Sequence, residues 1–320
     1  MHFFLEYFIL VNLINYCMSS IGDNSRYYKI CLERCILLDC ENFLSDSNRQ
    51  QLILYLTQWS CRDDCSYECM WKTVDFFQER HSITPQFHGK WPFYRFLGLQ
   101  EPASVFFSLL NAYVHLMMIR KFRKEVRSDS PLYWLWHAFF IVCLHAWFWS
   151  AVFHARDFPL TELLDYTCAF SIVLMSCYVM AIRVLRDILP GFALIIITFL
   201  FTVFFAKHVS YLSTGRIDYG YNMKLNIFVG AVIAICWIIW CLYNYKKQPY
   251  VWNCAKFVIL TAIVTLLEVI DQPPIYYVFD SHSIWHLSTA PLAIFLYRFA
   301  IDDCKFLKKQ EIKEDSKKLP

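Results

Sequence analysis

The chain has 320 residues, of which 58% are hydrophobic and 19% aromatic, while only 18% are charged. Soluble domains carry about 25% charged residues, so this composition excludes an ordinary soluble protein and points to a membrane. The net charge of +3 does not favour a nucleic-acid partner, and in a membrane protein the placement of charges matters more than their sum.

Residues 1–20 are mostly apolar and precede the polar stretch GDNSRYY. This pattern predicts a signal peptide that is cleaved near Ser19 or Ser20. The segment lacks Lys and Arg, and Glu6 interrupts it. An uncleaved anchor is therefore the alternative.

Residues 21–100 form a polar segment that we predict to be a luminal, cysteine-rich domain. Six cysteines behind a signal peptide indicate three disulfides in an oxidising compartment. Six cysteines allow 15 pairings, and the sequence does not choose among them. A zinc knuckle is the alternative, which entry into the secretory pathway disfavours. The six are Cys31, Cys35, Cys40, Cys61, Cys65 and Cys69.

Seven apolar runs follow, each close to the roughly 20 residues that a helix needs to cross a bilayer. The predicted fold class is therefore an all-α polytopic membrane protein, a seven-transmembrane-helix bundle with a small disulfide-rich N-terminal luminal domain. We expect the bundle to occupy residues 101–302 and a cytosolic tail to occupy 303–320. The predicted spans are 104–120, 132–153, 163–182, 191–212, 224–243, 255–271 and 283–300.

The basic residues predict the orientation of these spans. The loops at 120–127, 183–187 and 244–256 and the C-terminal tail are rich in Lys and Arg, whereas the alternate loops are poorer in both. Because positive residues mark the cytosolic side, the N-terminal domain is predicted to be luminal and the tail cytosolic.

Five polar residues then fall at the luminal ends of three spans. Ser150 and His154 are four residues apart on one helix face, as are His282 and His286, and Asp165 begins the third span. Three imidazoles that leave one position open are typical of catalytic zinc sites. The pair in the last span has no neighbouring Glu to act as a base, so we predict that role for Asp165. Ser150 is predicted to support the site or a developing oxyanion.

The alternative is that each histidine is an ordinary interfacial residue. Ionisable residues within spans are nonetheless functional candidates by default, because burying them is costly.

This set of residues resembles that of the CREST superfamily, a group of seven-span membrane hydrolases. Longer motifs narrow the resemblance to its Per-one-like family, which it matches almost end to end. These motifs are WSCRDDCSYECMW (59–71), QFHGKWPFYRF (86–96), QEPAS (100–104), AWFWSAVFHARD (146–157), LTELLDY (160–166), HVSYLS (208–213), DYGYN (218–222), LLEVIDQPP (266–274) and DSHSIWHLST (280–289).

The resemblance implies a Zn²⁺ ion held by His154, His282 and His286, with Asp165 and Ser150 as catalytic residues. It also implies fatty-acid remodelling of GPI anchors by a GPI-specific phospholipase A2 that removes the sn-2 acyl chain. The partners would be GPI-anchored proteins and their lipid moiety, in the Golgi or endoplasmic reticulum membrane. The luminal domain either reads the headgroup or caps the bundle. Nearby headgroup-binding candidates are Arg156, Asp218, Tyr219 and Asn222.

Three alternatives remain open at this stage. The alternatives to a phospholipase are a non-catalytic GPI-protein chaperone or cargo factor, a ceramidase-like amide hydrolase, and a seven-span receptor of the same superfamily. The ending KKLP fits a retrieval signal of the endoplasmic reticulum. The sequence does not decide between that compartment and the Golgi. The oligomeric state is not predicted.

Overall fold

The computed structural model describes residues 21–40, 57–81 and 83–318. The predicted signal peptide at 1–20 lies outside this range. Over the described residues the chain forms two compact units. The first comprises residues up to Ala103 together with Ile270–Ser281, and the second comprises Ser104–Val269 and His282 onward.

The first unit is built on two helices joined by disulfides. Helix α3 (Arg26–Asp39) follows the short helix α2 (Ile21–Asn24), and α5 (Cys61–His81) packs against α3. Ser25 caps α3, since its Oγ accepts a hydrogen bond of 3.1 Å from the N–H of Tyr28.

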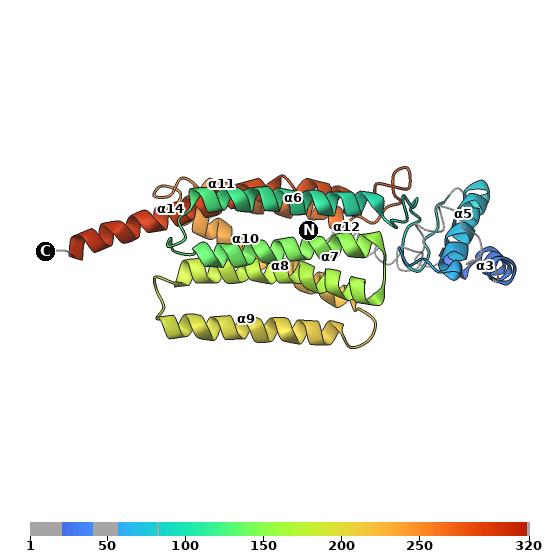
Figure 1. Ribbon diagram of the computed structural model, residues 1–320, viewed down its shortest axis with the longest axis horizontal. Coiled ribbons are helices and arrows are strands. Elements are labelled where there is room, and N and C mark those ends of the chain that lie inside the picture. The colour runs from blue at the N-terminus through green and yellow to red at the C-terminus, as the bar shows by residue number, and fades with distance from the viewer. Residues whose placement is uncertain (1–20, 41–56, 82, 319–320) are drawn as a thin grey trace, which may run out of the picture. The chain divides into compact units, whose positions relative to one another are not determined.

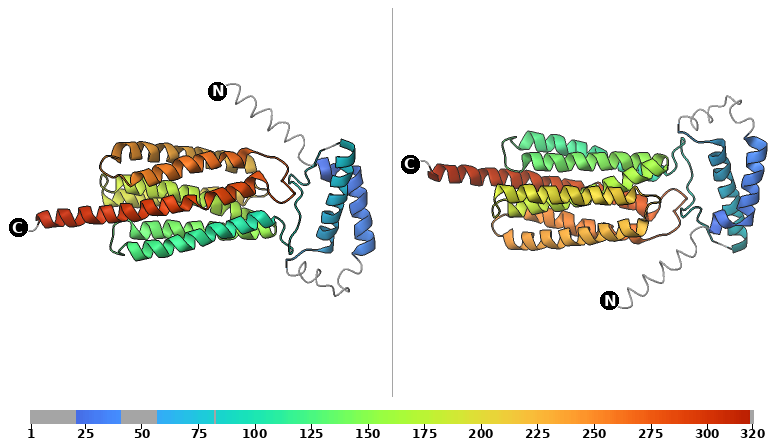
Figure 2. Two further views of the ribbon diagram at one scale, coloured as in Figure 1. Left: turned by 90° about the horizontal axis from the view of Figure 1, so that it is seen from above. Right: turned by 90° about the horizontal axis from the view of Figure 1, so that it is seen from below.

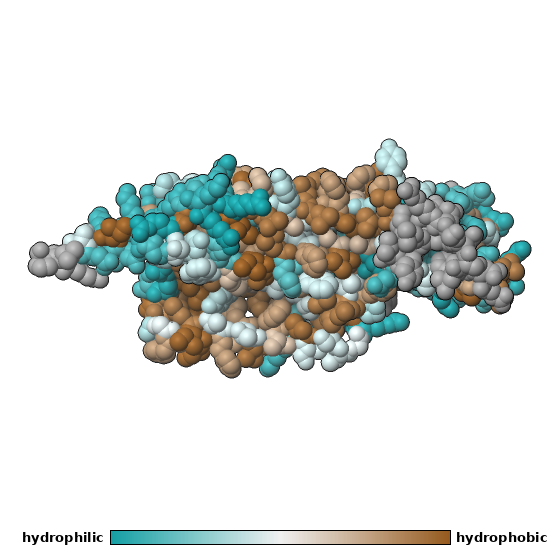
Figure 3. All heavy atoms as spheres, in the orientation of Figure 1, coloured by the Kyte–Doolittle hydropathy of each residue, from teal (hydrophilic) through white to brown (hydrophobic). Residues whose placement is uncertain are grey.

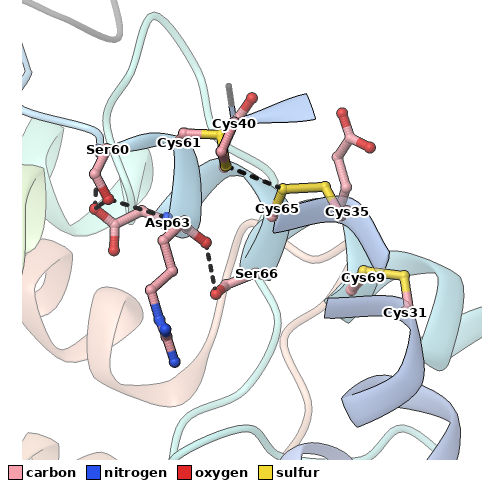
Figure 4. Close-up of a disulfide and its surroundings, with 12 residues drawn as sticks. Cys31, Cys35, Cys40, Ser60, Cys61, Asp63, Cys65, Ser66 and Cys69 are labelled. Atoms are coloured by element: carbon pink, nitrogen blue, oxygen red, sulfur yellow. Dashed lines mark hydrogen bonds between the residues drawn. A yellow bond between two sulfur atoms is a disulfide. The ribbon is translucent and has the colours of Figure 1, made fainter. Parts of the chain in front are cut away.

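The six cysteines that we predict to form disulfides are paired between the α3 segment and α5 in a nested order (Figure 4). Cys31 and Cys35 on α3, and the three cysteines of α5, follow one another at intervals of four residues, which places each set on one face of its helix; Cys40 is the C-cap of α3. The helices run antiparallel, so the first cysteine of α3 meets the last of α5. The three disulfides are Cys31–Cys69, Cys35–Cys65 and Cys40–Cys61.

The segment at 270–281 belongs to the first unit because its hydrogen bonds go there. Asp271 accepts hydrogen bonds from Gln86 and from the indole of Trp91. The carbonyl of Tyr277 accepts a hydrogen bond of 2.9 Å from the N–H of Tyr94. Thus the connection between two bundle helices is itself part of the disulfide-bonded unit.

The second unit is a helix bundle, and seven of its described helical segments are long and apolar enough to cross a membrane. The predicted fold class is confirmed: this is a multi-pass, all-α membrane protein with a disulfide-rich N-terminal region. The helices are α6 (Pro102–Glu125), α7 (Tyr133–Ala155), α8 (Pro159–Leu185), α9 (Gly191–Leu212), α10 (Tyr219–Asn244), α11 (Val251–Val264), α12 (Leu266–Val269), α13 (Ser281–Thr289) and α14 (Leu292–Lys318).

The last two spans differ from single straight helices. The sixth is interrupted at Thr265, between α11 and α12, and the seventh at Ala290–Pro291, between α13 and α14. Pro291 has no N–H to donate and its ring clashes with the preceding turn, which explains the second break. Helix α14 then continues without interruption through residue 302 to Lys318, and its C-terminal end projects beyond its neighbours (Figures 1 and 2).

The core of the bundle is aromatic and centres on α7 and α14. Phe140 stacks on Tyr297 with ring centroids 3.8 Å apart, and Trp136 meets Phe299 edge to face at 5.8 Å. Helix α9 is the opposite case, because it lies at the edge of the bundle and presents nearly all of its apolar surface outward (Figure 1). Hydrophobic side chains cover the middle of the bundle, whereas hydrophilic ones gather at the end from which α14 projects (Figure 3).

Candidate metal centre

Three buried or half-buried imidazoles meet at the other end of the bundle. We call His154, His282 and His286 the histidine triad. The Nε2 atom of His282 lies 3.2 Å from Nε2 of His154 and 2.8 Å from Nε2 of His286. All three ligand atoms lie within 4.8 Å of one another. The structure therefore brings together the three histidines that the sequence singled out.

Local geometry explains this convergence. His282 and His286 are four residues apart on α13, so they share one face of that helix. His154 lies in the last turn of α7, just before a short connection to α8. Aromatic rings surround the triad: Trp285 stacks on His282, with centroids 5.7 Å apart, and Trp147 meets His286 at 5.3 Å.

The outer nitrogen of each α13 histidine faces a polar side chain. Nδ1 of His282 is 2.7 Å from Oε2 of Glu268 on α12. Nδ1 of His286 is 3.4 Å from Oγ of Ser108 on α6. In both rings the inner Nε2 points to the centre of the triad while Nδ1 is engaged outside it.

Asp165 and Ser150 also reach this region, from α8 and α7. Asp165 lies within electrostatic range of His154 and His282, and close to Ser150. The Oγ of Ser150 is 3.1 Å from that of Ser108. The tight α7–α8 connection makes this possible: Pro159 starts α8, and the hydroxyl of Thr161 accepts a hydrogen bond from the N–H of Phe158.

Two side chains also donate hydrogen bonds to the backbone carbonyl of His286. Asn111 on α6 donates a hydrogen bond of 2.7 Å to the carbonyl of His286, and Thr289 donates to the same oxygen at 2.8 Å. These contacts stabilise the short helix α13 just before the break at Pro291.

The four predicted headgroup residues have mainly local contacts. Arg156 ends α7, donating its N–H to the carbonyl of Val152, and its guanidinium lies over the ring of Phe158 at 4.6 Å. The amide of Asn226 donates to the side chain of Asn222 at 3.1 Å.

Asp218 caps α10, where hydrogen bonds from the N–H of Tyr221 and the hydroxyl of Tyr211 lower the pKa of its carboxyl. Tyr219 donates to Glu162, and its ring lies 5.4 Å from that of Tyr166, the residue after Asp165. Of the four candidates, Tyr219 is thus linked to the neighbourhood of Asp165. A headgroup role for all four remains a prediction.

The donor set of the triad suits a metal ion. Two nitrogens of a tetrahedral zinc site with bonds of 2.0–2.1 Å lie about 3.3 Å apart. The distance between the Nε2 atoms of His154 and His282 is 3.2 Å, and that between those of His282 and His286 is somewhat shorter at 2.8 Å. Within the described residues, two further groups have metal-ligand spacing, and both contain cysteines of the first unit. Those cysteines are oxidised to disulfides, so they offer no thiolate to a metal. The triad is the group whose chemistry fits.

Glu268, Ser108 and Asn111 were not among the residues singled out from the sequence. Four polar residues follow one another on the apolar part of α6 at intervals of three or four residues, which places them on one side of the helix. They are Ser104, Ser108, Asn111 and His115. All four are buried. A polar stripe at helical spacing within a membrane span faces the bundle interior, and this signal could have identified them. Glu268 falls within the predicted span 255–271, three residues before Asp271, and has no charged residue at helical spacing in the apolar part of that span to draw attention to it.

Known proteins are similar to this chain along most of its length. The model of the Per1-like family matches residues 51–304. Post-GPI attachment to proteins factor 3 of Drosophila melanogaster is 45% identical over 299 residues, which cover 90% of both chains. GPI-specific phospholipase A2-like PGAP3 of Xenopus laevis is 42% identical over 98% of this chain and 99% of that protein. Its counterpart in Homo sapiens is 43% identical over 94% and 93%, respectively. No solved structure matches the chain.

Proposed function

The chain belongs to the Per1-like family, and from that premise we propose that it remodels GPI anchors as a zinc-dependent phospholipase A2. The reaction is hydrolysis of the sn-2 ester of the GPI lipid, at the luminal leaflet of the Golgi or endoplasmic reticulum membrane. The relatives in Xenopus and human carry the name GPI-specific phospholipase A2-like. The observation that carries the proposal is the histidine triad with Asp165 beside it.

The triad would hold the zinc ion through its three Nε2 atoms. When bound, Zn²⁺ supplies a Lewis acid that activates water and polarises a carbonyl oxygen.

Asp165 is the general base in this proposal. Its carboxylate takes the proton of the attacking water and returns it to the alkoxide that leaves when the ester bond breaks. Ser150 lies close to Asp165, and its single O–H can either orient the base or support the developing oxyanion.

A lipid substrate agrees with the surroundings of the site. An open groove of about 480 Å³ lies between α10 and α11, and its lining is entirely aliphatic. Leu266 of α12, two residues before Glu268, forms part of that lining. We assign the groove to an acyl chain of the substrate, which keeps the ester near the triad while the chain stays in an apolar environment.

The distribution of charge supports the proposed orientation. The connections at 126–132, 186–190 and 245–250 and the end of α14 all lie at the end of the bundle away from the triad. These connections and the turns beside them carry most of the basic residues. Positive residues favour the cytosol, so the triad lies on the luminal side, where GPI lipids are exposed.

The test is zinc content and fatty-acid release from purified GPI lipid, measured on the detergent-solubilised protein. His154→Ala is expected to lose both, because two imidazoles hold zinc poorly. His81→Ala, at an exposed position of α5, is the matched control and should retain both.

Each other result favours a different function. Zinc without turnover would indicate a chaperone or cargo factor. Release from ceramide in preference to GPI lipid would indicate an amide hydrolase. Neither zinc nor turnover in the wild-type protein would contradict the proposal and favour a receptor.

A further inference from the structure

Each histidine of α13 has a polar partner at its Nδ1. For His282 that partner is a carboxylate, because Nδ1 lies 2.7 Å from Oε2 of Glu268. A carboxylate only accepts hydrogen bonds, so Nδ1 of His282 is the donor. An imidazole that is protonated at Nδ1 and neutral carries its lone pair on Nε2, the atom that faces the triad.

For His286 the partner is a serine. In the proposed metal site the Nε2 lone pair of His286 faces the triad, so Nδ1 carries the proton and donates to Oγ of Ser108, 3.4 Å away. Ser108 can then direct its own O–H at Oγ of Ser150, 3.1 Å away. The hydrogen bonds thus run in one direction, from His286 through Ser108 to Ser150.

We infer that Glu268 and Ser108 are positioning residues that hold His282 and His286 in the Nδ1–H tautomer, with both Nε2 lone pairs directed at one point. This inference rests on the proposed metal-binding role of the triad. Partners of this kind fix ring orientation and raise the basicity of a metal-bound imidazole. Here the contact of His282 is short and charge-assisted, whereas the contact of His286 is longer and neutral.

The need for such partners follows from the fold. Helix α13 has only nine residues, so its backbone alone restrains the two rings little. Without an acceptor at Nδ1, an imidazole is free to carry its proton on Nε2 and donate it to a neighbouring ring. The break at Thr265 gives Glu268 its own short helix, α12, from which its side chain reaches His282.

Zinc affinity, measured by competition with a chelator on the full-length protein, tests the inference. Glu268→Ala is expected to weaken zinc binding about 10–100-fold, the range typical of such partners. Glu268→Gln should lose less, because the amide oxygen still accepts from Nδ1. Ser108→Ala should also lose less than Glu268→Ala, since a neutral contact at 3.4 Å is weaker than a charge-assisted one at 2.7 Å. Glu311→Gln, which removes an exposed carboxylate paired with Lys308, is the control.

Thermal unfolding separates positioning from a structural role. The melting temperature of the zinc-free Glu268→Ala protein should equal that of the zinc-free wild type, and only the rise on adding zinc should shrink. Wild-type zinc affinity in Glu268→Ala, or an equally lowered melting temperature with and without zinc, would overturn the inference.

A third measurement does not depend on zinc and so separates this inference from the proposed function. In the metal-free protein with ¹⁵N-labelled histidine, NMR should show His282 protonated at Nδ1. The Glu268→Ala variant should show a mixture of tautomers. Protonation of His282 at Nε2 in the wild type would overturn the inference even if zinc hydrolysis were established.

Discussion

In the proposed mechanism, the histidine triad and Asp165 have separable tasks. The triad offers nitrogen ligands, whereas Asp165 approaches from α8 and acts as the base. A proton acceptor that is not itself a ligand can be removed without removing the metal. This division gives the residue-scale prediction.

Asp165→Asn should reduce turnover of GPI lipid by about 10²–10⁴-fold, the range typical of general-base catalysis, while the protein retains its zinc. The amide keeps the shape of the side chain but cannot take a proton from water. Asp187→Asn, in an exposed turn after α8, serves as the control and should leave turnover unchanged. Loss of zinc together with activity in Asp165→Asn would show that Asp165 is a ligand instead.

At the scale of elements, a buried ion pair joins α8 to α14 at the end of the bundle away from the triad. Arg183 donates to both carboxylate oxygens of Asp303 at 2.8–2.9 Å, and Tyr250 donates to the same carboxylate at 2.9 Å. Both members of the pair are almost completely buried. The network joins the third span to the seventh. Helix α8 carries Asp165, and α14 directly follows α13, which carries His282 and His286.

Asp303→Ala should lower the free energy of unfolding by about 3–5 kcal/mol, because it leaves the Arg183 charge buried without its partner. The double variant Arg183→Met with Asp303→Leu should recover most of that loss, since it removes both charges. Thermal unfolding in detergent measures the difference between the two. An Asp303→Ala protein with the same melting temperature as the wild type would show that the ion pair contributes nothing to stability.

At the scale of the whole molecule, the proposed orientation has its own test. Ser128 in the basic α6–α7 connection and Ser213 at the end of α9 are exposed and lie at opposite ends of the bundle. In sealed microsomes, a membrane-impermeant maleimide should label Ser128→Cys directly but Ser213→Cys only after detergent is added. The wild-type protein gives the background from native cysteines. The reverse pattern would place the triad in the cytosol and exclude a luminal GPI substrate.

The sequence predicts the architecture well because seven apolar runs and their charged connections are direct consequences of the bilayer. It also identifies His154, His282 and His286, since pairs four residues apart share a helix face. It does not predict the nested disulfide pairing, which requires α3 and α5 to be antiparallel. The contact of Glu268 with His282 joins the sixth span to the seventh, and residue spacing within one span carries no information about it.

The proposed activity is hydrolysis of the sn-2 ester of a GPI lipid with zinc held by the histidine triad. The most direct measurement uses purified GPI lipid with an isotope label in the sn-2 acyl chain and follows its products by mass spectrometry. We predict that the wild-type protein releases the labelled fatty acid and leaves a lyso-GPI, that removal of zinc abolishes release, and that stoichiometric zinc restores it. Undiminished release by the zinc-free protein, or label that stays in the lipid when zinc is bound, would contradict the account.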